Sequence, residues 1–378
     1  MPTRNLLDWI SLNLLPGLGP VSIARALARF GDPGVIAYGI PVRQLVGLPG
    51  IRRPELAKIE EARRTLRARA ERELLQAERL GLHVRVRGDD GYPAALFELP
   101  DAPALLFVRG SIPEGVVRVA IVGSRNCTRY GERVAAGLGA GLGERAIEVV
   151  SGGARGIDTC AHRGALDSGG RTIAVLGSGF ANPYPRENVD LFDRIAETGA
   201  VISEFALDVP PAKSTFPRRN RLISGLSVAV VVVEATRRSG SLVTARHALE
   251  QGREVLAIPG PVFSDRSCGT NGLIQQGAKL VQDVEDIVEE LSPIYRGAIT
   301  TPARATASEL DLSGLLPDEE TVLQMLDPVE ARQLDELAEH APFSFARLQA
   351  ALFALEVRGA IEVLPGRHYQ RRGGTGKP

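Results

Sequence analysis

Six short apolar runs, most of them rich in β-branched residues, alternate with amphipathic stretches through the middle of this 378-residue chain. Apolar runs of this length, each followed by a loop and a helical pattern, are typical of parallel strands buried on both faces. Successive strand–helix units of this kind pack as a doubly wound α/β sheet with helices on both sides. The six predicted strands are Val117–Val122, Glu148–Val150, Thr172–Leu176, Ala200–Ser203, Val228–Val233 and Val255–Ile258. We expect them to belong to one domain, residues 79–292.

The segment before the sheet, residues 1–78, has a helical pattern interrupted by two similar turns. The turns are Leu15–Gly19 and Gly47–Ile51, and an amphipathic helix is expected after each. The pair resembles helix-hairpin-helix or SAM-like modules, in which bare amides at a helix N-terminus contact a DNA phosphate. The alternative is a helical bundle used for docking, because neither turn contains a lysine or arginine.

The segment after the sheet changes character twice. Residues 293–317, rich in Thr, Ala, Ser and Pro, lack periodicity and are expected to be a linker. Residues 318–371 predict three helices followed by two strands joined at Pro365–Gly366, which is typical of a winged helix-turn-helix. Residues 372–378 are expected to be a disordered tail, since no strand precedes their glycine-rich run as a phosphate-binding loop requires.

Overall charge does not indicate a nucleic-acid partner, because 45 basic residues balance 45 acidic ones. Any such surface must be local, and cations do cluster between Lys213 and Arg253. Cys127, Cys160 and Cys268 stand far apart, so neither a disulfide framework nor a zinc site is expected. The first residues lack the apolar core of a signal peptide, and the longest apolar run is too short to span a bilayer. We therefore expect a cytoplasmic protein with no membrane partner.

Glycine and serine are concentrated where the predicted strands end. In an open parallel sheet these ends share one edge, and ligands bind in the crevice beyond it. Small residues let backbone amides approach an anion, and hydroxyls add further donors. We therefore predict a phosphate-binding rim at this edge, formed by Gly123, Ser124, Arg125, Ser151, Gly152, Gly153, Ser239, Gly240 and Ser241.

One segment adds cations and an aromatic ring to this rim. Within nine positions it contains Lys213, Phe216, Arg218, Arg219 and Arg221. Positive charge, a stacking surface and planar guanidinium donors together suit a polynucleotide bound without sequence preference. Two alternatives remain open: Phe216 as a core residue, and Arg237 and Arg238 as solvated loop charge.

The motifs argue against cofactors. The first predicted strand is followed by Gly-Ser-Arg rather than G-x-G-x-x-G, and the second ends in Ser-Gly-Gly rather than an acid, so NAD is not expected. A Walker A sequence does not follow any predicted strand. We expect neither a cofactor nor a metal.

Catalytic residues are also not expected, although some acids and a serine–histidine pair are candidates. Asp158 and His162 lie one helical turn apart with Ser151 just upstream, which would allow a serine hydrolase site, but the G-x-S-x-G elbow is absent. An Asp at this position usually caps the helix, and the following His packs against the sheet. Glu204 and Glu234 end strands, where orienting nearby arginines is the expected role. The alternative is an enzyme that uses the same crevice for a nucleotide or phosphoribosyl substrate.

Several stretches match one family in order and spacing. They include VAIVGSRNCTRYG, VVSGGARGIDTCAHRGAL, FPRRNRLISGLS, VVVVEATRRSGSLVTARHALEQGREVLAIPGPV and GTNGLIQQGAKLV. On these motifs, from Val117 to Val281, the chain resembles the DNA-processing protein A (DprA, or Smf) family. One departure is Ala181, where the family usually has an acid before the Tyr-Pro pair, which affects a local contact in that loop.

The resemblance implies an extended Rossmann fold that binds single-stranded DNA without known catalysis. It implies a homodimer through that fold and delivery of incoming strands to the RecA recombinase in natural transformation (competence) and homologous recombination, with double-stranded DNA as a weaker ligand. It places phosphate contacts on the Gly123–Arg125 and Ser151–Gly153 loops, and basic or stacking contacts on Lys213, Phe216, Arg219, Asn220 and Arg221. A sequence-specific duplex reader is a third hypothesis, disfavoured because helix Phe345–Arg358 has few cations or amides for base edges.

Overall fold

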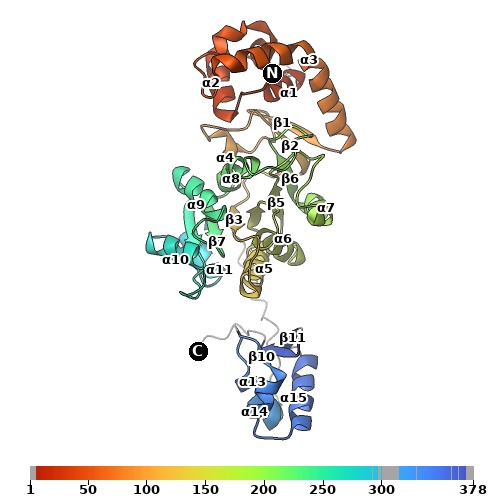
Figure 1. Cartoon of the computed structure of the whole chain (residues 1–378), viewed down its shortest axis with the longest axis vertical. Helices are drawn as coiled ribbons and strands as arrows, with labels where there is room; N and C mark the ends of the chain where they lie inside the picture. Colours follow the sequence, from red (N-terminus) through yellow and green to blue (C-terminus); the bar gives the residue numbers. More distant parts are fainter. Residues whose placement is uncertain are drawn as a thin grey trace. The chain divides into compact units, whose positions relative to one another are not determined.

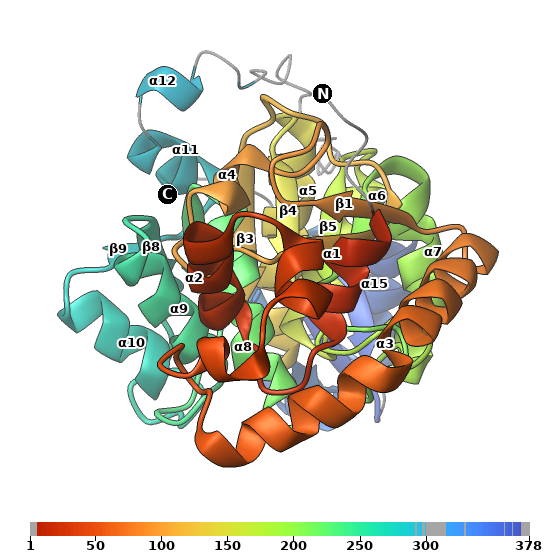
Figure 2. The same cartoon turned by 90° about the horizontal axis from the view of Figure 1, so that it is seen from above.

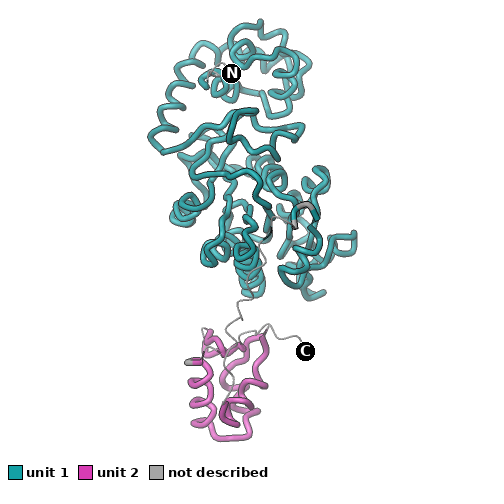
Figure 3. The backbone as a smooth tube through the Cα atoms, turned by 180° about the vertical axis from the view of Figure 1, so that it is seen from behind, with its two compact units in different colours: residues 1–300 teal, residues 301–378 magenta. Residues whose placement is uncertain are grey.

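The computed structural model describes residues 6–291, 293–296, 299, 315–328, 330–358, 360–364 and 366–371. It divides into two compact units, Met1–Thr300 and Thr301–Pro378 (Figure 3). Of the expected linker, residues 297–298 and 300–314 lie outside the described residues, and a short helix, α12 (Pro293–Arg296), occupies its start. The expected tail at 372–378 also lies outside the described residues.

A nine-stranded sheet organises the first unit, in the order β1-β2-β6-β5-β4-β3-β7-β8-β9 (Figure 1). The strands from β6 to β9 in this order run parallel to one another. They are β3 (Arg118–Val122), β4 (Glu148–Ser151), β5 (Thr172–Val175), β6 (Ala200–Ser203), β7 (Ala229–Val232), β8 (Glu254–Ala257) and β9 (Lys279–Leu280). All six predicted strands are present to within one residue at each end, which confirms the doubly wound α/β fold.

The sequence did not predict the two strands at the other edge of the sheet. β1 (His83–Val86) and β2 (Leu105–Gly110) are antiparallel to each other, and β2 is antiparallel to β6. They come before the first strand–helix unit, so no alternation with helices indicates them. They extend the parallel sheet by two strands.

Helices cover both faces of the sheet (Figure 1). One face packs against α5 (Arg129–Glu144), α6 (Ile157–Asp167), α7 (Val189–Thr198) and α11 (Val284–Glu290). The other packs against α4 (Ala94–Phe97), α8 (Thr215–Gly225), α9 (Ser241–Glu250) and α10 (Cys268–Gln275). Neighbouring residues of β3 point to opposite faces of the sheet. Ile121 belongs to the apolar core shared with α5 and α6, and Val122 to the core shared with α8 and α9. A short helix, η3 (Arg186–Asn188), precedes α7.

The helical segment before the sheet packs directly on the β1–β2 edge (Figures 1 and 2). It comprises α1 (Leu6–Leu14), α2 (Pro20–Phe30), a π-helical turn η1 (Val35–Gly39), η2 (Val42–Leu45) and α3 (Arg53–Arg79). The helix after the first predicted turn contacts the second turn, because Ser22 Oγ of α2 donates a hydrogen bond to Pro49 O. Trp9 and Ile59 share one apolar core with Phe107 of β2. The helices and the sheet therefore form a single compact unit.

The second unit has three helices and a small sheet. The helices are α13 (Pro317–Met325), α14 (Leu334–His340) and α15 (Phe345–Val357), which pack around Val322, Leu337 and Leu348. β11 (Ile361–Leu364) and β12 (His368–Arg371) are the predicted hairpin, although Pro365 in its turn lies outside the described residues. A third strand not predicted, β10 (Arg332–Gln333), pairs with β12. In the described parts of both units, no helix is long and apolar enough to cross a membrane.

Helices α5 and α6 pack closely because glycines remove side chains at their contact. A Cβ atom added to Gly139 of α5 would overlap the carbonyl oxygen of Ala161 in α6. Gly137, two residues earlier on α5, faces open space, and a Cβ atom added there would meet nothing within 4 Å. The two glycines therefore differ in packing but share the same helical backbone.

We expect Gly139→Ala to lower the free energy of unfolding by about 1–3 kcal/mol, because α5 must move away from α6. The matched variant Gly137→Ala should raise it by up to about 1 kcal/mol, since alanine loses less backbone entropy in a helix. Urea unfolding of the two variants measures both effects. Equal changes in the two variants would contradict the proposed close packing.

Candidate functional site

A pocket of about 500 Å³ opens at the carboxyl edge of the sheet, where the order of the parallel strands reverses. The chain leaves β3 toward β4 on one side and later returns to β7 on the other, so the loops after β3 and β7 diverge. These loops, Gly123–Asn126 and Thr236–Ser241, form two walls of the pocket, and the start of α8 forms a third.

Ten of the residues predicted from three separate segments line this one pocket. They are Gly123, Ser124, Arg125, Lys213, Phe216, Arg219, Asn220, Ser239, Gly240 and Ser241. The predicted residues that do not line it are Ser151, Gly152, Gly153 and Arg221. The structure thus assembles most of the predicted rim but leaves Ser151, Gly152 and Gly153 at the start of the loop after β4 out of the pocket lining.

Phe216 is half-buried at the start of α8, with a cation over its ring. The Arg125 guanidinium lies 4.4 Å from the ring centroid, and the Tyr184 ring lies 5.8 Å away at 52°. The ring rests against Gly177, where an added Cβ would lie 2.5 Å from its Cδ1 atom. Thr215 fixes the start of α8 there by donating from Oγ1 to Gly177 O at 2.5 Å. Phe216 is therefore held at the pocket wall rather than in the core.

Lys213 provides unpaired positive charge at the mouth of the pocket. Its side chain is exposed, and among the described residues it forms no ion pair with a carboxylate. Arg237 and Arg238 on the β7 loop are exposed in the same way. A hydrogen bond from Asn220 Nδ2 to Gly240 O at 3.2 Å holds the loop after β7 to α8. Within that loop, the hydroxyl oxygens of Ser239 and Ser241 lie 2.7 Å apart and share a hydrogen bond.

Arg219 forms the floor of the pocket and is only 3% exposed. Its Nη1 donates to Gly152 O at 2.5 Å and also to Val175 O, and burial lowers its pKa to about 10. The neighbouring carboxylate of Asp158 accepts hydrogen bonds from Gly152 N at 3.1 Å and Ala154 N at 3.2 Å. Burial raises the pKa of Asp158, while the Arg219 charge opposes that rise. The pocket floor is therefore a rigid polar layer with a cation at its surface.

The loop after β4 supports this floor from below. Ser151 Oγ donates to Ile121 O at 2.6 Å, and the Gly152 backbone contacts Arg219 and Asp158. An added Cβ on Gly153 would lie 2.6 Å from Cε1 of Phe192. The predicted phosphate-binding residues Ser151, Gly152 and Gly153 are thus buried under the pocket and do not face it.

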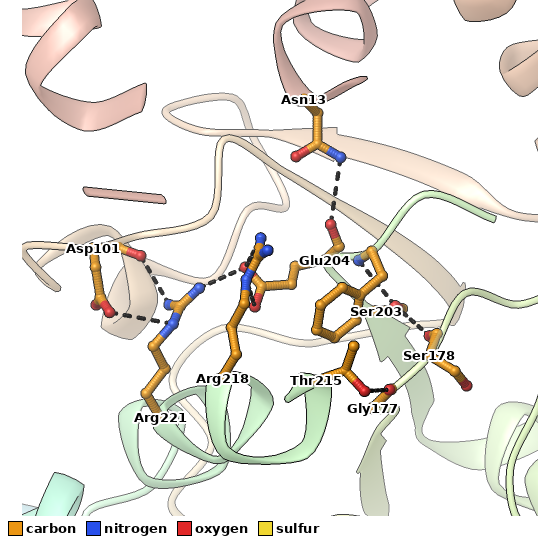
Figure 4. Close-up of polar contacts among 10 residues, drawn as sticks. Asn13, Asp101, Gly177, Ser178, Ser203, Glu204, Thr215, Arg218 and Arg221 are labelled. Carbon is orange, nitrogen blue, oxygen red and sulfur yellow. Dashed lines mark hydrogen bonds and ion pairs between the residues drawn. The ribbon is translucent and has the colours of Figure 1, made fainter. Parts of the chain in front are cut away.

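Arg221 lies on a different face of α8, in a buried ion-pair cluster (Figure 4). Its Nη2 donates to Glu204 Oε2, and its Nε lies 3.2 Å from Asp101 Oδ2. Arg218 reaches the other oxygen of Glu204 at 3.2 Å, while Asn13 Nδ2 of α1 donates to the Glu204 carbonyl oxygen at 3.4 Å. The expected role of Glu204 in orienting arginines is confirmed, and Arg221 joins it rather than the pocket.

Two family models match parts of this chain. Residues 83–292 match the family model described as DNA recombination-mediator protein A, and residues 301–367 match a DprA winged helix domain. The chain belongs to the DNA recombination-mediator protein A family. Membership confirms the resemblance drawn from the motifs and the winged-helix prediction for the second unit.

Relatives in this family cover most of the chain. Protein Smf of Escherichia coli K12 is 42% identical over 292 residues, which is 77% of this chain and 78% of the relative. DNA processing protein DprA of Streptococcus pneumoniae R6 is 46% identical over 203 residues, 53% of this chain and 72% of the relative.

Two solved structures of family members are also similar. The X-ray structure of DprA from Streptococcus pneumoniae has a TM-score of 0.67 and 36% identity, covering 77% of this chain and 99% of that chain. The structure of DprA from Helicobacter pylori, solved to describe its single-stranded DNA binding mode, has a TM-score of 0.50 and 30% identity over 55% of this chain and 94% of that chain.

In this member of the DNA recombination-mediator protein A family, helical periodicity separates the residues of α8 into two sets. Phe216, Arg219, Asn220 and Ile223 follow the i, i+3, i+4, i+7 spacing of one helix face, and all four line the pocket. Arg218 and Arg221 are three residues apart on another face. Helical spacing is therefore a sequence signal that separates Arg221 from the residues that line the pocket.

Further pocket residues were not predicted. The structure adds Val122, Asn126, Ala154, Pro217, Ile223, Thr236, Val243 and Thr244, as well as Asp158. Thr244 lies one turn after Ser241 on α9, so helical spacing was an available signal for it. For Asp158 the sequence predicts only a helix cap or a catalytic partner.

The candidate catalytic groups are all committed to structural contacts. His162 is fully buried with Nδ1 2.7 Å from Thr172 Oγ1, and burial lowers its pKa to about 3. Asp158 is not the expected cap of α6: the N-cap position is Gly156, without a side-chain cap, and the Asp158 carboxylate accepts hydrogen bonds from Gly152 N and Ala154 N in the loop before the helix. Glu234 differs from expectation, because it accepts hydrogen bonds from Thr128 N at 2.9 Å and Thr128 Oγ1 at 2.5 Å at the start of α5 rather than orienting an arginine.

The buried Glu204 cluster predicts a stability effect that the pocket cations do not share. We expect Arg221→Ala to lower the free energy of unfolding by about 3–5 kcal/mol, because Glu204 loses a buried partner. The loss should be near the lower value, since Arg218 remains paired with Glu204. Lys213→Ala should change it by no more than about 0.5 kcal/mol, since Lys213 is exposed and unpaired. Chemical unfolding of both variants tests the difference, and equal stability of Arg221→Ala and the unmodified chain would refute the structural role.

Proposed function

We propose that this chain binds single-stranded DNA in the pocket between β3, β7 and α8 and delivers it to the RecA recombinase in natural transformation and homologous recombination. One observation carries the DNA-binding part: residues from three distant segments join unpaired cations, hydroxyls and an aromatic ring at one crevice. The Helicobacter pylori family member, whose structure describes a single-stranded DNA binding mode, supports the same ligand. Delivery to RecA is supported by family membership alone.

The phosphate chain would be held by charge and by small polar groups. Lys213 and Arg125 are exposed at the mouth, and the Ser239–Ser241 loop offers hydroxyls and bare amides beside them. Arg219 adds a fixed positive charge beneath. Because these groups suit phosphates rather than base edges, binding should tolerate any sequence and weaken with salt.

Base stacking on Phe216 requires the neighbouring cation to move. In the free protein the Arg125 guanidinium covers the ring at 4.4 Å. A cation–π contact at an exposed site contributes about 0.5–1 kcal/mol, whereas a stacked base contributes about 1–3 kcal/mol. A base can therefore replace Arg125 on the ring with a net gain, and the released guanidinium is available to a phosphate.

The remaining expectations are proposals that rest mainly on the family. We propose a homodimer through the sheet-containing unit, a cytoplasmic location, weaker binding of double-stranded DNA and no catalysis at the bound strand. The commitment of Asp158, His162 and Ser151 to structural hydrogen bonds supports the last of these. We also propose domain boundaries at residues 1–78, 79–292, 293–317, 318–371 and 372–378.

Removing the stacking surface should weaken DNA binding. We expect Phe216→Ala to cost about 1–3 kcal/mol in affinity for oligothymidylate, measured by fluorescence anisotropy. The matched control is Phe97→Ala, which also removes a ring beneath an arginine, Arg87 at 5.1 Å, but lies outside this pocket. Equal affinity of the two variants would exclude Phe216 as a base platform.

Removing one phosphate contact should reduce the salt dependence. We expect Lys213→Ala to lower the slope of log affinity against log salt concentration by about 0.7–1, the value for one phosphate on a single strand. Lys279→Ala is the control, because Lys279 is paired with Glu290 at 3.6 Å on β9. An unchanged slope in Lys213→Ala would remove this residue from the site, and a co-purified mononucleotide that is turned over would favour an enzyme instead.

A further inference from the structure

One aromatic side chain outside the pocket is fully exposed to solvent. Phe263 is 100% exposed and its neighbour Val262 is 79% exposed, in the loop between β8 and α10. None of the described residues stacks on the Phe263 ring. The exposed apolar surface of this Phe263–Val262 pair is available to a ligand, and covering it would be favourable.

The loop that carries Phe263 is held in place by hydrogen bonds on both sides of the ring. Asn271 of α10 clamps Gly260, with Nδ2 donating to Gly260 O at 3.0 Å and Oδ1 accepting from Gly260 N at 3.2 Å. After the ring, Ser267 N donates to Ser264 O at 3.1 Å. A ligand would therefore meet a preformed apolar surface with little ordering cost.

The same loop is bonded directly to the pocket. Arg266 Nη1 donates to the carbonyl oxygen of Asn126, which lines the pocket, at 2.5 Å. Its own carbonyl accepts from Ala235 N at 2.8 Å, at the start of the β7 loop. Because β8 neighbours β7 in the sheet, the Phe263 loop continues the same carboxyl edge.

Positive charge lies along this edge between the two aromatic residues. In the strand order β3, β7, β8, the β7 loop comes between the Phe216 pocket and the Phe263 loop. It carries Arg237 and Arg238, both exposed and, within the described ranges, without a carboxylate partner. Two aromatic rings separated by free guanidinium groups suit a strand with alternating bases and phosphates.

We propose that single-stranded DNA extends from the pocket across the Arg237–Arg238 loop and stacks a further base on Phe263. This inference rests on the proposed function, and it adds a second stacking position that sets how much strand one chain occupies. Phe263 acts only on strands long enough to reach it, whereas Phe216 acts on every strand.

Strand length separates the two positions. With the full chain and oligothymidylates of about 4 and about 16 nucleotides, the range of single-strand site sizes, Phe263→Ala should weaken binding of the long strand about 5- to 150-fold and leave binding of the short one unchanged. Phe216→Ala should weaken both. The control is Phe353→Ala, which removes another exposed phenylalanine, 68% accessible on α15, and should change neither.

A spectroscopic variant tests the stacking itself. In Phe263→Trp, the long strand should quench the indole fluorescence and retain affinity, while the short strand should leave the fluorescence unchanged. A further ligand is a long strand that carries bases only on its first about 4 nucleotides and is abasic in the rest. It keeps all its phosphates but offers no base to stack on residue 263. It should not quench the indole and should bind Phe263→Ala as well as the unmodified protein.

Three outcomes would overturn the inference. The first is unchanged long-strand affinity in Phe263→Ala while Phe216→Ala is weakened, which leaves the proposed function intact. The second is a molar mass of Phe263→Ala, measured by light scattering at the binding concentration, that is lower than that of the unmodified protein. This result would mean that the ring belongs to a contact between copies of the chain. The third is full affinity of Phe216→Ala for both strands, which removes the proposed function together with this extension.

Discussion

Buried guanidinium groups hold helix α8 in place, and the rest of the site depends on them. Arg219 binds the carbonyl oxygens of Gly152 and Val175 beneath the pocket, while Arg221 binds Glu204 on another side of the helix. Burying a guanidinium group costs free energy unless its N–H donors form hydrogen bonds. Each of these contacts therefore restricts the helix to positions in which the donors stay bonded. The positions of Phe216 and Asn220 follow, because both lie on the helix that these arginines anchor.

This arrangement divides the cations of one segment between two roles. Arg218, Arg219 and Arg221 have protein partners, whereas Lys213 just before the helix has no carboxylate partner among the described residues. The unpaired charges lie at the crevice where strand order reverses, which is where a polyanion can reach them. A chain with zero net charge can thus present a locally positive surface without a basic overall composition.

Much of the fold could be predicted because buried parallel strands are apolar on both faces. Runs such as Val228–Val233, which alternate with helical patterns, are typical of strands inside a parallel sheet, and the carboxyl ends of parallel strands share one edge. β1 and β2 were missed because they precede any strand–helix alternation. Among site residues, Gly123 and Ser241 were predictable from loop position and Thr244 from its helical spacing to Ser241, whereas the apolar side chain of Val243 carries no chemical signal of its own.

The order of residues along the chain was enough to specify the doubly wound sheet and the set of strand-end loops that share one edge, because apolar periodicity and parallel connection leave few alternatives. Which of those loops stay open to a ligand was determined by packing in three dimensions. Ser151–Gly153 is chemically as suited to phosphate as Gly123–Arg125, yet Phe192, Asp158 and Arg219 bury it. Helical spacing separates Arg219 from Arg221, but only packing against the sheet determines which helix face meets the crevice, since burial depends on neighbours remote in sequence.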